Sequence, residues 1–438
     1  MQRSLWGLVV TRNQNRKRNS QERGGVSIQM LVILVPVLFG FMGFAVDLGR
    51  LYLVKGELNQ AASAMATAAA SQLNGTTQAA TAAANAAQSM LDDSMNSASR
   101  YNFGSIVIGQ ATVGLNSGVD PAALFATAQE AIAAAGQPGA VSAADGSTAR
   151  HVTINLNADA PLLFWSLLSL GQSRHVTIAA TAVAGMSAPL CTACGIEPFA
   201  IAPIDAGDTT NFGFTPGNAY TLGMQCTGAP PALLAGTTAP RVAYLIVDRY
   251  DSGGALLEDQ QLFRIGAQGM IPSNPAFACS RINNTENIWA TAAVRACNAA
   301  GVNQSVQNLL CGLSTRFTTT TPAACSANAD LNDLVAAYPA DTNSDSITDY
   351  PSYDGNSRRV ITVAVVDALS TGGAMQVQGF RQFLLNPTPG LDPVANNPAD
   401  ANGRYAALYL GSVMPVKQGR FDGSCGATAG PGKVVLHQ

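Results

Sequence analysis

The stretch from residue 22 to residue 73 constrains this chain most, because a long apolar run continues there into a regular apolar stripe. Between Ile28 and Val46 there is no charged residue, and Gln29 is the only strongly polar one. A helix of this length rises about 28 Å, enough to cross the hydrocarbon core of a bilayer. A backbone in lipid must satisfy its own hydrogen bonds, so the sequence predicts a transmembrane helix over residues 26–46.

The charges on either side of this span predict its orientation. The leader, residues 1–25, carries six basic residues and a single acid, whereas the charges directly after the span cancel. The positive-inside rule therefore predicts a cytoplasmic N-terminus and a C-terminal region outside the cytoplasm. A cleaved signal peptide is the alternative, with cleavage near Ala45 or after Gly25. The long leader and the long apolar run favour permanent anchoring.

An apolar stripe continues beyond the membrane at spacings of three and four residues, which is typical of one face of a helix. Its members are Leu51, Val54, Leu58, Ala61, Met65 and Ala68. The pattern predicts a single helix to about Leu73, ended by Asn74 and Gly75. Its outer half is rich in Ala and Ser, which permits close helix packing. Two interpretations remain open: packing against like helices, or a stalk that packs on its own domain.

Several motifs in this region carry a family resemblance. They are Arg23-Gly24-Gly25, an apolar run containing Pro36, the step from Ala45 to Tyr52 (AVDLGRLY), and Leu58-Asn59-Gln60-Ala61-Ala62. Together these 50 or so residues resemble the N-terminal region of TadE/TadG-like proteins of the tight-adherence (Flp) pilus assembly system of bacteria.

The resemblance implies a pilin-like protein of the bacterial inner membrane that assists or joins a surface fibre. Its partners would be other Tad/Flp assembly proteins or pilins. The assembly helix would include Pro36, Asp47, Gly49, Arg50, Leu58, Ala61 and Ala62. The chain departs from the family pattern at Met30, where processed members carry Glu, and it has no DxSxS metal site.

Composition fits an exported protein that binds no nucleic acid. Without the leader, 18 basic and 26 acidic residues remain, a net charge of −8. Nucleic-acid binding needs basic patches against phosphates. The sequence also lacks GxSxG, HExxH, P-loop and GxGxxG motifs in suitable positions, so we predict neither catalysis nor a cofactor.

Cysteine usage predicts disulfides in the exported part. The eight cysteines are Cys191, Cys194, Cys226, Cys279, Cys297, Cys311, Cys325 and Cys425. An even number in an oxidising compartment indicates disulfides, although sequence alone does not give the pairing. A redox role for Cys191-Thr-Ala-Cys194 is disfavoured by its loop context. The three histidines show no zinc-ligand spacing.

The remaining pattern predicts an α+β chain with a mainly antiparallel β ectodomain. We expect a helical stalk over 47–100, a small α+β region over 101–190 and the cysteine-containing β ectodomain over 191–438. Helices are expected at 76–91, 120–136, 288–299 and 302–311, and strands at 105–114, 241–247, 359–366, 375–385, 404–410 and 433–436.

A small internal echo, Arg150-His-Val-Thr-Ile154 and Arg174-His-Val-Thr-Ile178, predicts two strands with the histidines on the more polar face. The apolar segment between them, Pro161–Leu170, is expected to form a short core helix that caps the sheet. Contact with the membrane or a partner is the alternative for this segment.

One segment resembles the start of a calcium loop. Asp341, Asn343, Asp345 and Asp349 place oxygen ligands at positions 1, 3, 5 and 9. Ser346 replaces the glycine of an EF-hand, and position 12 is Ser352 rather than Glu. A polar turn is the default interpretation, and a looser calcium site is the alternative.

Two functions are compatible with these features. The first is an envelope-anchored component of Tad/Flp pilus assembly, acting through helix and ectodomain contacts. The second is a membrane-tethered extracytoplasmic binding module unrelated to pili.

Overall fold

The computed structural model describes the chain in several stretches. These are residues 22–97, 122–137, 142–168, 174–226, 240–250, 279–282, 288–290, 304–317, 325, 339–341, 347, 349–385, 402–411, 414–416, 419–420, 425–427 and 429–437. The chain divides into two compact units. The anchor unit comprises Met1–Gly56 and Asp159–Ile178, and the ectodomain unit comprises Glu57–Ala158 and Ala179–Gln438.

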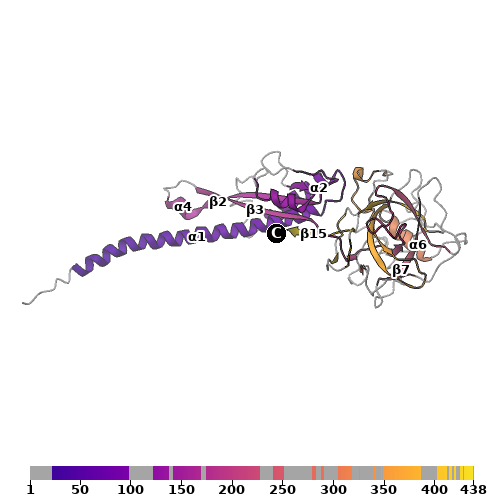
Figure 1. Ribbon diagram of the computed structural model, residues 1–438. Coiled ribbons are helices and arrows are strands. Elements are labelled where there is room, and N and C mark those ends of the chain that lie inside the picture. Colours follow the sequence, from indigo (N-terminus) through magenta and orange to yellow (C-terminus); the bar gives the residue numbers. More distant parts are fainter. Residues whose placement is uncertain are drawn as a thin grey trace, which may run out of the picture. The chain divides into compact units, whose positions relative to one another are not determined.

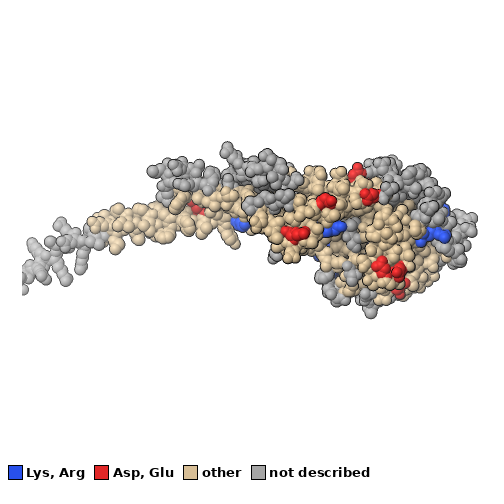
Figure 2. Space-filling model, turned by 45° about the horizontal axis from the view of Figure 1, so that its top comes forward, with Lys and Arg blue, Asp and Glu red and all other residues tan. Residues whose placement is uncertain are grey.

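Helix α1, Glu22–Ala70, is one unbroken helix despite Pro36 in its interior (Figure 1). Among the described residues it is the one helix long and apolar enough to cross a membrane. Its uncharged first part is plain in Figure 2. The helix ends three residues before the predicted Leu73, and Gly75 follows with φ = 83°. The predicted long helix and its glycine stop are therefore confirmed, whereas residues 1–21 of the leader lie outside the described part.

A short helix lies between two long strands, and only the strand ends next to it, within Asp159–Ile178, belong to the anchor unit. Strand β2, His151–Leu162, leads directly into helix α4, Leu163–Leu168, and strand β3, Arg174–Met186, follows (Figure 1). β2 and β3 are neighbours in a four-stranded sheet of order β1-β2-β3-β15. Both strands of the sequence echo are thus confirmed, and they extend well beyond it.

The outer strands of this sheet are β1, Ala122–Phe125, and β15, Val434–His437. The helix expected over 120–136 is wrong in its first half. Residues 122–125 pair with β2 instead, and helix α3, Ala128–Ala134, begins after a capping box formed by Thr127 and Glu130. Helix α2, Ala79–Ser97, confirms the expected second helix; the strand expected at 105–114 lies outside the described residues.

The larger part of the ectodomain unit is a closed barrel. Its strands are β5 (Phe199–Ile201), β6 (Ala219–Met224), β7 (Arg241–Arg249), β10 (Val360–Val366), β12 (Val377–Leu385) and β13 (Tyr405–Gly411). They follow the order β7-β5-β10-β12-β13-β6, and pairing of β6 with β7 closes the ring. The pairings β5–β10 and β6–β7 are parallel and the other four antiparallel. The predicted mainly antiparallel β region is confirmed.

Aromatic side chains fill the barrel. Phe199 packs against Tyr244 and Tyr405, and Phe214 packs against Phe383. Helix α6, Gln304–Ser314, adds Val306, Leu309, Leu310 and Leu313 to the same core. These contacts bury a large apolar area, which is the main favourable term for a domain of this size.

Helix α6 confirms the helix expected at 302–311. The helix expected at 288–299 is wrong at its start, because Ile288–Ala290 forms strand β9 between β7 and β11 (Ala374–Met375). Residues 291–299 lie outside the described part.

A three-stranded sheet of order β14-β4-β8 lies in the cysteine-containing region. Its strands are β4 (Thr192–Cys194), β8 (Cys279–Arg281) and β14 (Gly419–Arg420). Cys194 lies opposite Cys279 in this sheet and is bonded to it. The other described bridges join Cys191 to Cys425 and Cys311 to Cys325.

Disulfide formation is confirmed for the described cysteines, none of which is free. Cys226 is also disulfide-bonded, and Cys297 lies outside the described residues. The two cysteines of the CxxC motif bond to different partners, so they do not form a dithiol redox centre with each other.

Candidate functional site

The anchor unit contains a carboxylate bound by the N-terminus of a helix. Asp47 of α1 accepts hydrogen bonds from three consecutive backbone N–H groups of α4. Oδ1 accepts from Leu163 (3.1 Å) and Phe164 (3.2 Å), and Oδ2 accepts from Phe164 (3.1 Å) and Trp165 (3.0 Å). The Asp47 side chain is only 7% exposed. A buried acid is thus compensated by the peptide dipoles of a helix end.

The local sequence explains why α4 needs this acceptor. The first turn of a helix leaves backbone N–H groups without intrahelical partners, and a Ser, Thr, Asp or Asn at the N-cap normally accepts from them. The residues before α4 are Pro161 and Leu162, neither of which has a side-chain acceptor. Asp47 supplies the missing acceptor from a position more than one hundred residues away in the chain.

Packing beside Asp47 requires a glycine. A Cβ atom at Gly43, one helical turn before Asp47, would collide with the ring of Phe164. Phe39, Met42, Gly43 and Val46 of α1, with Leu163 and Phe164 of α4, line an apolar pocket of about 320 Å³. α4 therefore lies against the part of α1 that the sequence assigns to the membrane.

These contacts bear on two segments that the sequence singled out. Asp47, expected as a residue of the assembly helix, is buried and bound by backbone N–H groups of its own chain. We expected residues 161–170 to form a core helix capping the sheet. α4 is indeed a short helix, but Leu163 is 57% exposed and Trp165 52%. Leu163 and Trp165 are therefore not part of a core.

The other predicted helix residues fall into two groups. Leu58, Ala61 and Ala62 are buried within the ectodomain unit, so that face of α1 packs on its own chain. This finding favours the stalk interpretation for the outer half of the helix. A Cβ atom at Gly49 would meet no atom within 4 Å, and Pro36 lies in the exposed first half.

No protein-family model, curated protein or solved structure matches this chain.

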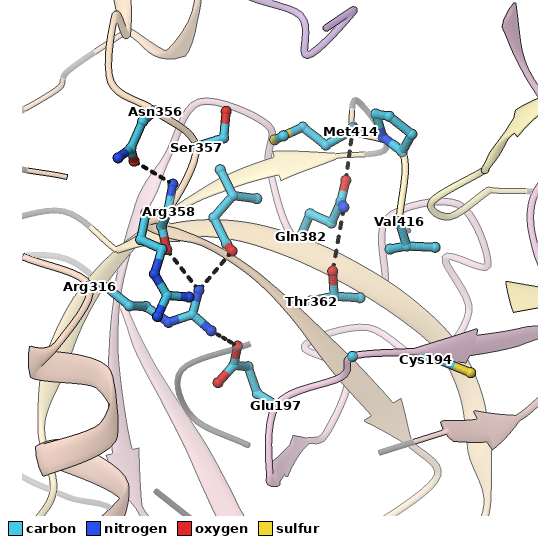
Figure 3. Close-up of a pocket in the computed structure, with 13 residues that line it drawn as sticks. Cys194, Glu197, Arg316, Asn356, Ser357, Arg358, Thr362, Gln382, Met414 and Val416 are labelled. Carbon is cyan, nitrogen blue, oxygen red and sulfur yellow. Dashed lines mark hydrogen bonds and ion pairs between the residues drawn. The ribbon is translucent and has the colours of Figure 1, made fainter. Parts of the chain in front are cut away.

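A second candidate site is a pocket of about 270 Å³ in the ectodomain unit (Figure 3). One side is formed by Glu197 and Arg316, whose carboxylate and guanidinium are in direct contact, both fully buried. Arg316 Nη1 also donates to the carbonyls of Arg358 (2.8 Å) and Val360 (3.2 Å). The pocket thus combines a buried ion pair with a polar wall.

The opposite side of this pocket contains a short hydrogen-bonded chain, visible in Figure 3. Gln382 donates to the Thr362 hydroxyl (3.4 Å) and accepts from the Met414 backbone N–H (3.0 Å). Glu197 Oε2 is buried with no hydrogen-bond partner, so one polar atom at the pocket remains unsatisfied.

Burial dominates the electrostatics of the Glu197–Arg316 pair. Removal from water raises the pKa of the Glu197 carboxyl to about 8, and the charges of Arg316 and Arg358 act in the opposite direction. Removal from water likewise lowers the pKa of the Arg316 guanidinium, which Glu197 opposes. Each partner therefore stabilises the charged form of the other against the cost of burial.

The candidate calcium loop is engaged in other contacts where the structure describes it. Asp341 is buried, lies 3.3 Å from Arg359 Nε, and accepts a hydrogen bond from the Tyr353 hydroxyl. Asn343 and Asp345 lie outside the described residues, and the Asp349 carbonyl accepts hydrogen bonds from Ser352. The described residues contain no group of three or more potential metal ligands.

The predicted polar placement of the histidines is wrong for His151. This residue is buried, and its ring lies 5.1 Å from that of His437 on β15 rather than on an open face. Burial lowers the pKa of His151, and the neighbouring His437 acts in the same direction. The side chain of His175 lies outside the described part.

Sequence reasoning missed both buried acid contacts. A signal was present for Glu197, an isolated acid in the apolar segment from Gly195 to Ile201, because a lone acid among core residues requires a partner. No comparable signal pointed to the Asp47–α4 contact, which depends on the return of the hairpin to α1.

Proposed function

We propose that this chain is an envelope-anchored component of a Tad/Flp pilus assembly system, either a minor pilin-like subunit or an assembly scaffold. The N-terminal motifs support the family, and the leader charges support a cytoplasmic N-terminus with an ectodomain outside the inner membrane. The disulfides support an oxidising compartment for the ectodomain.

One observation carries this proposal: the contrast along α1. From Ile28 to Leu53 the helix exposes a series of large apolar side chains, whereas Leu58 and Met65 are fully buried in the ectodomain unit. A single helix therefore joins a folded domain to an apolar segment that only lipid or other apolar helices can cover. Assembly contacts would then use the first half of α1.

The test exploits the glycines of that first half. At Gly40 and Gly49 an added Cβ meets nothing within 4 Å, so Leu at either position fits the folded chain. Bulk there would nevertheless block close approach of a second helix. We expect Gly40→Leu and Gly49→Leu to keep normal levels in the membrane but to reduce surface fibres seen by electron microscopy.

Asn59→Leu is the matched control, because Asn59 is exposed on the outer half of α1. Fibres should be normal in this variant. Ala61 and Ala62 are unsuitable positions for the test, since Leu there would overpack the chain's own core. Normal fibres in a strain lacking the gene would contradict the proposal directly.

The pocket at Glu197 favours a second candidate, a membrane-tethered binding module unrelated to pili. Its polar wall and the unsatisfied Glu197 oxygen are features of a small-ligand site. If the Gly40→Leu and Gly49→Leu variants build fibres like the parent, the tethered module becomes the better account.

A further inference from the structure

The tip of the β2–α4–β3 hairpin presents apolar side chains that no described part of the chain covers. Leu163 and Trp165 are more than half exposed. No charged residue occurs between Asp159 and Arg174. An uncharged segment with exposed Leu and Trp side chains is unusual for a surface in water and typical of a segment at a membrane interface.

Contacts within the anchor unit show which residues of α1 lie beside α4. Phe164 packs over Gly43, and the apolar pocket beside it is lined by Phe39, Met42 and Val46. These α1 residues belong to the predicted span and are themselves largely exposed, apart from Gly43. A segment packed against them lies at the same depth, so a bilayer that surrounds this part of α1 also meets α4.

Asp47 makes such a position energetically acceptable. In hydrocarbon an unsatisfied backbone N–H group costs several kcal/mol, on the order of the cost of burying any unpaired polar group. The N–H groups of Leu163, Phe164 and Trp165 all donate to Asp47. The same contact gives the Asp47 carboxylate three hydrogen-bond donors. The free-energy cost of removing the carboxylate and the N–H groups from water is therefore lower for both.

We propose that the hairpin tip is a second membrane contact, inserted into the outer leaflet of the bilayer that α1 crosses. Asp47 acts as a positioning residue that holds α4 at this depth. The inference rests on the membrane anchoring of α1 in the proposed function, and it adds an anchor that the transmembrane span does not itself provide.

Lipid is the partner we expect to cover the apolar side chains of α4, because these side chains continue the apolar surface of α1. Leu163 and Phe164 line one apolar pocket together with Phe39, Met42 and Val46, which makes one apolar surface from two segments. A surface that includes a transmembrane span is covered by acyl chains along its length. A second copy of the chain is the competing occupant, and the experiment distinguishes it.

The test uses the full-length chain, reconstituted in vesicles, and its three Trp residues, Trp6, Trp165 and Trp289. W6F/W289F leaves Trp165 as the only Trp, and W6F/W165F leaves Trp289 on strand β9 of the ectodomain unit as the matched control. Vesicles contain lipids brominated either near the head group or near the chain ends. We expect strong quenching of Trp165, greater for bromine near the head group, and little quenching of Trp289.

A third single-tryptophan variant, F41W with all three native Trp residues replaced by Phe, reports on α1 itself. If the residue-41 fluorophore is quenched and Trp165 is not, the hairpin inference is overturned while anchoring stands. If neither is quenched, anchoring fails and the inference fails with it. Trp165 emission that is insensitive to bromine but shifts with the protein-to-lipid ratio would assign the tip to a second copy, which also overturns the inference.

Variants of Asp47 test its positioning role. In the Trp165-only background, Asp47→Ala removes both acceptor oxygens, whereas Asp47→Asn keeps one. We expect Trp165 quenching to fall strongly in Asp47→Ala and less in Asp47→Asn, with the residue-41 fluorophore still quenched in both. Unchanged Trp165 quenching in Asp47→Ala would show that packing alone positions α4 and would remove Asp47 from the proposal.

Discussion

The anchor unit and the ectodomain unit each bury a carboxylate, and they compensate it by different means. Asp47 is held by backbone N–H groups of α4, whereas Glu197 contacts the guanidinium of Arg316. Peptide dipoles satisfy hydrogen-bonding capacity without burying a second charge. An ion pair buries two charges, so each depends on the other.

Apolar side chains of α1 also differ between the two units, in how far they are exposed. Leu53 in the anchor unit is 46% exposed, whereas Leu58 in the ectodomain unit is completely buried, although both lie on α1. Packing within the chain stabilises the second position, whereas the first is left exposed by its own chain. The comparison teaches that similar residues on one helix depend on different surroundings, which mutations can separate.

The largest expected effect is loss of one partner of the buried ion pair. Above about pH 8, where the Glu197 carboxyl is ionised, Arg316→Met leaves that charge buried without its cation, which should lower the free energy of unfolding by about 3–5 kcal/mol. Denaturant unfolding of the detergent-solubilised chain, followed by near-ultraviolet circular dichroism of the barrel aromatics, measures this change. The exposed Arg420→Met is the matched control and should have little effect.

The double variant Glu197→Leu with Arg316→Met sharpens this test. Removing both charges eliminates the unpaired ion, so most of the lost stability should return. A double variant as unstable as Arg316→Met alone would show that the charges are not coupled as their contact indicates.

The next effect separates the two parts of α1. Leu58→Ala creates a cavity in the ectodomain unit and should cost about 2–5 kcal/mol. Leu53→Ala should change the unfolding free energy of the ectodomain by no more than about 0.5 kcal/mol, since it removes exposed atoms. The same unfolding experiment measures both. Equal losses at the two positions would mean that burial within the chain does not distinguish these parts of the helix.

The smallest effect concerns pH. Because the folded-state pKa of Glu197 is raised from 4.5 to about 8, the folded chain binds more protons than the unfolded chain between these values. The contribution of this group is therefore fully present below about pH 4.5 and declines as the pH rises toward 8. Thermal midpoints measured across that range should fall with rising pH.

Glu197→Gln provides the comparison for the pH experiment. The amide keeps the shape of the side chain but does not titrate, so the part of the slope due to Glu197 should disappear. An identical slope in the parent and in Glu197→Gln would assign the pH dependence to other groups.

Local patterns predicted much of the fold. Alternating and continuous apolar runs located β7, β10, β12, β13 and β15, and the apolar stripe with its glycine stop located α1. These signals are local because strand and helix periodicities are read within one segment. Closure of the barrel through β6 and β7 depends on pairings between distant segments, which no local period encodes.

The errors have similar physical causes. Pro121 resembled a helix start, but pairing with β2 converted the following residues into a strand, so tertiary contacts outweighed a local signal. Asp47 was named only as a residue of the assembly helix, and its hydrogen-bond partners lie more than one hundred residues away, beyond the reach of a local pattern. The contact of Asp341 with Arg359 was likewise missed, because the spacing of acids along the chain does not reveal a distant partner.

The bridge between Cys191 and Cys425 has a mechanical consequence. The two cysteines are 234 residues apart in the sequence, and every strand of the barrel lies between them. β15 follows Cys425 near the C-terminal end. Tension applied between the membrane anchor and the C-terminal strand passes from Cys191 to Cys425 through covalent bonds. The barrel strands lie in the loop that this disulfide closes. A pulling force therefore bypasses them and reaches β15 without stretching the segment between the two cysteines.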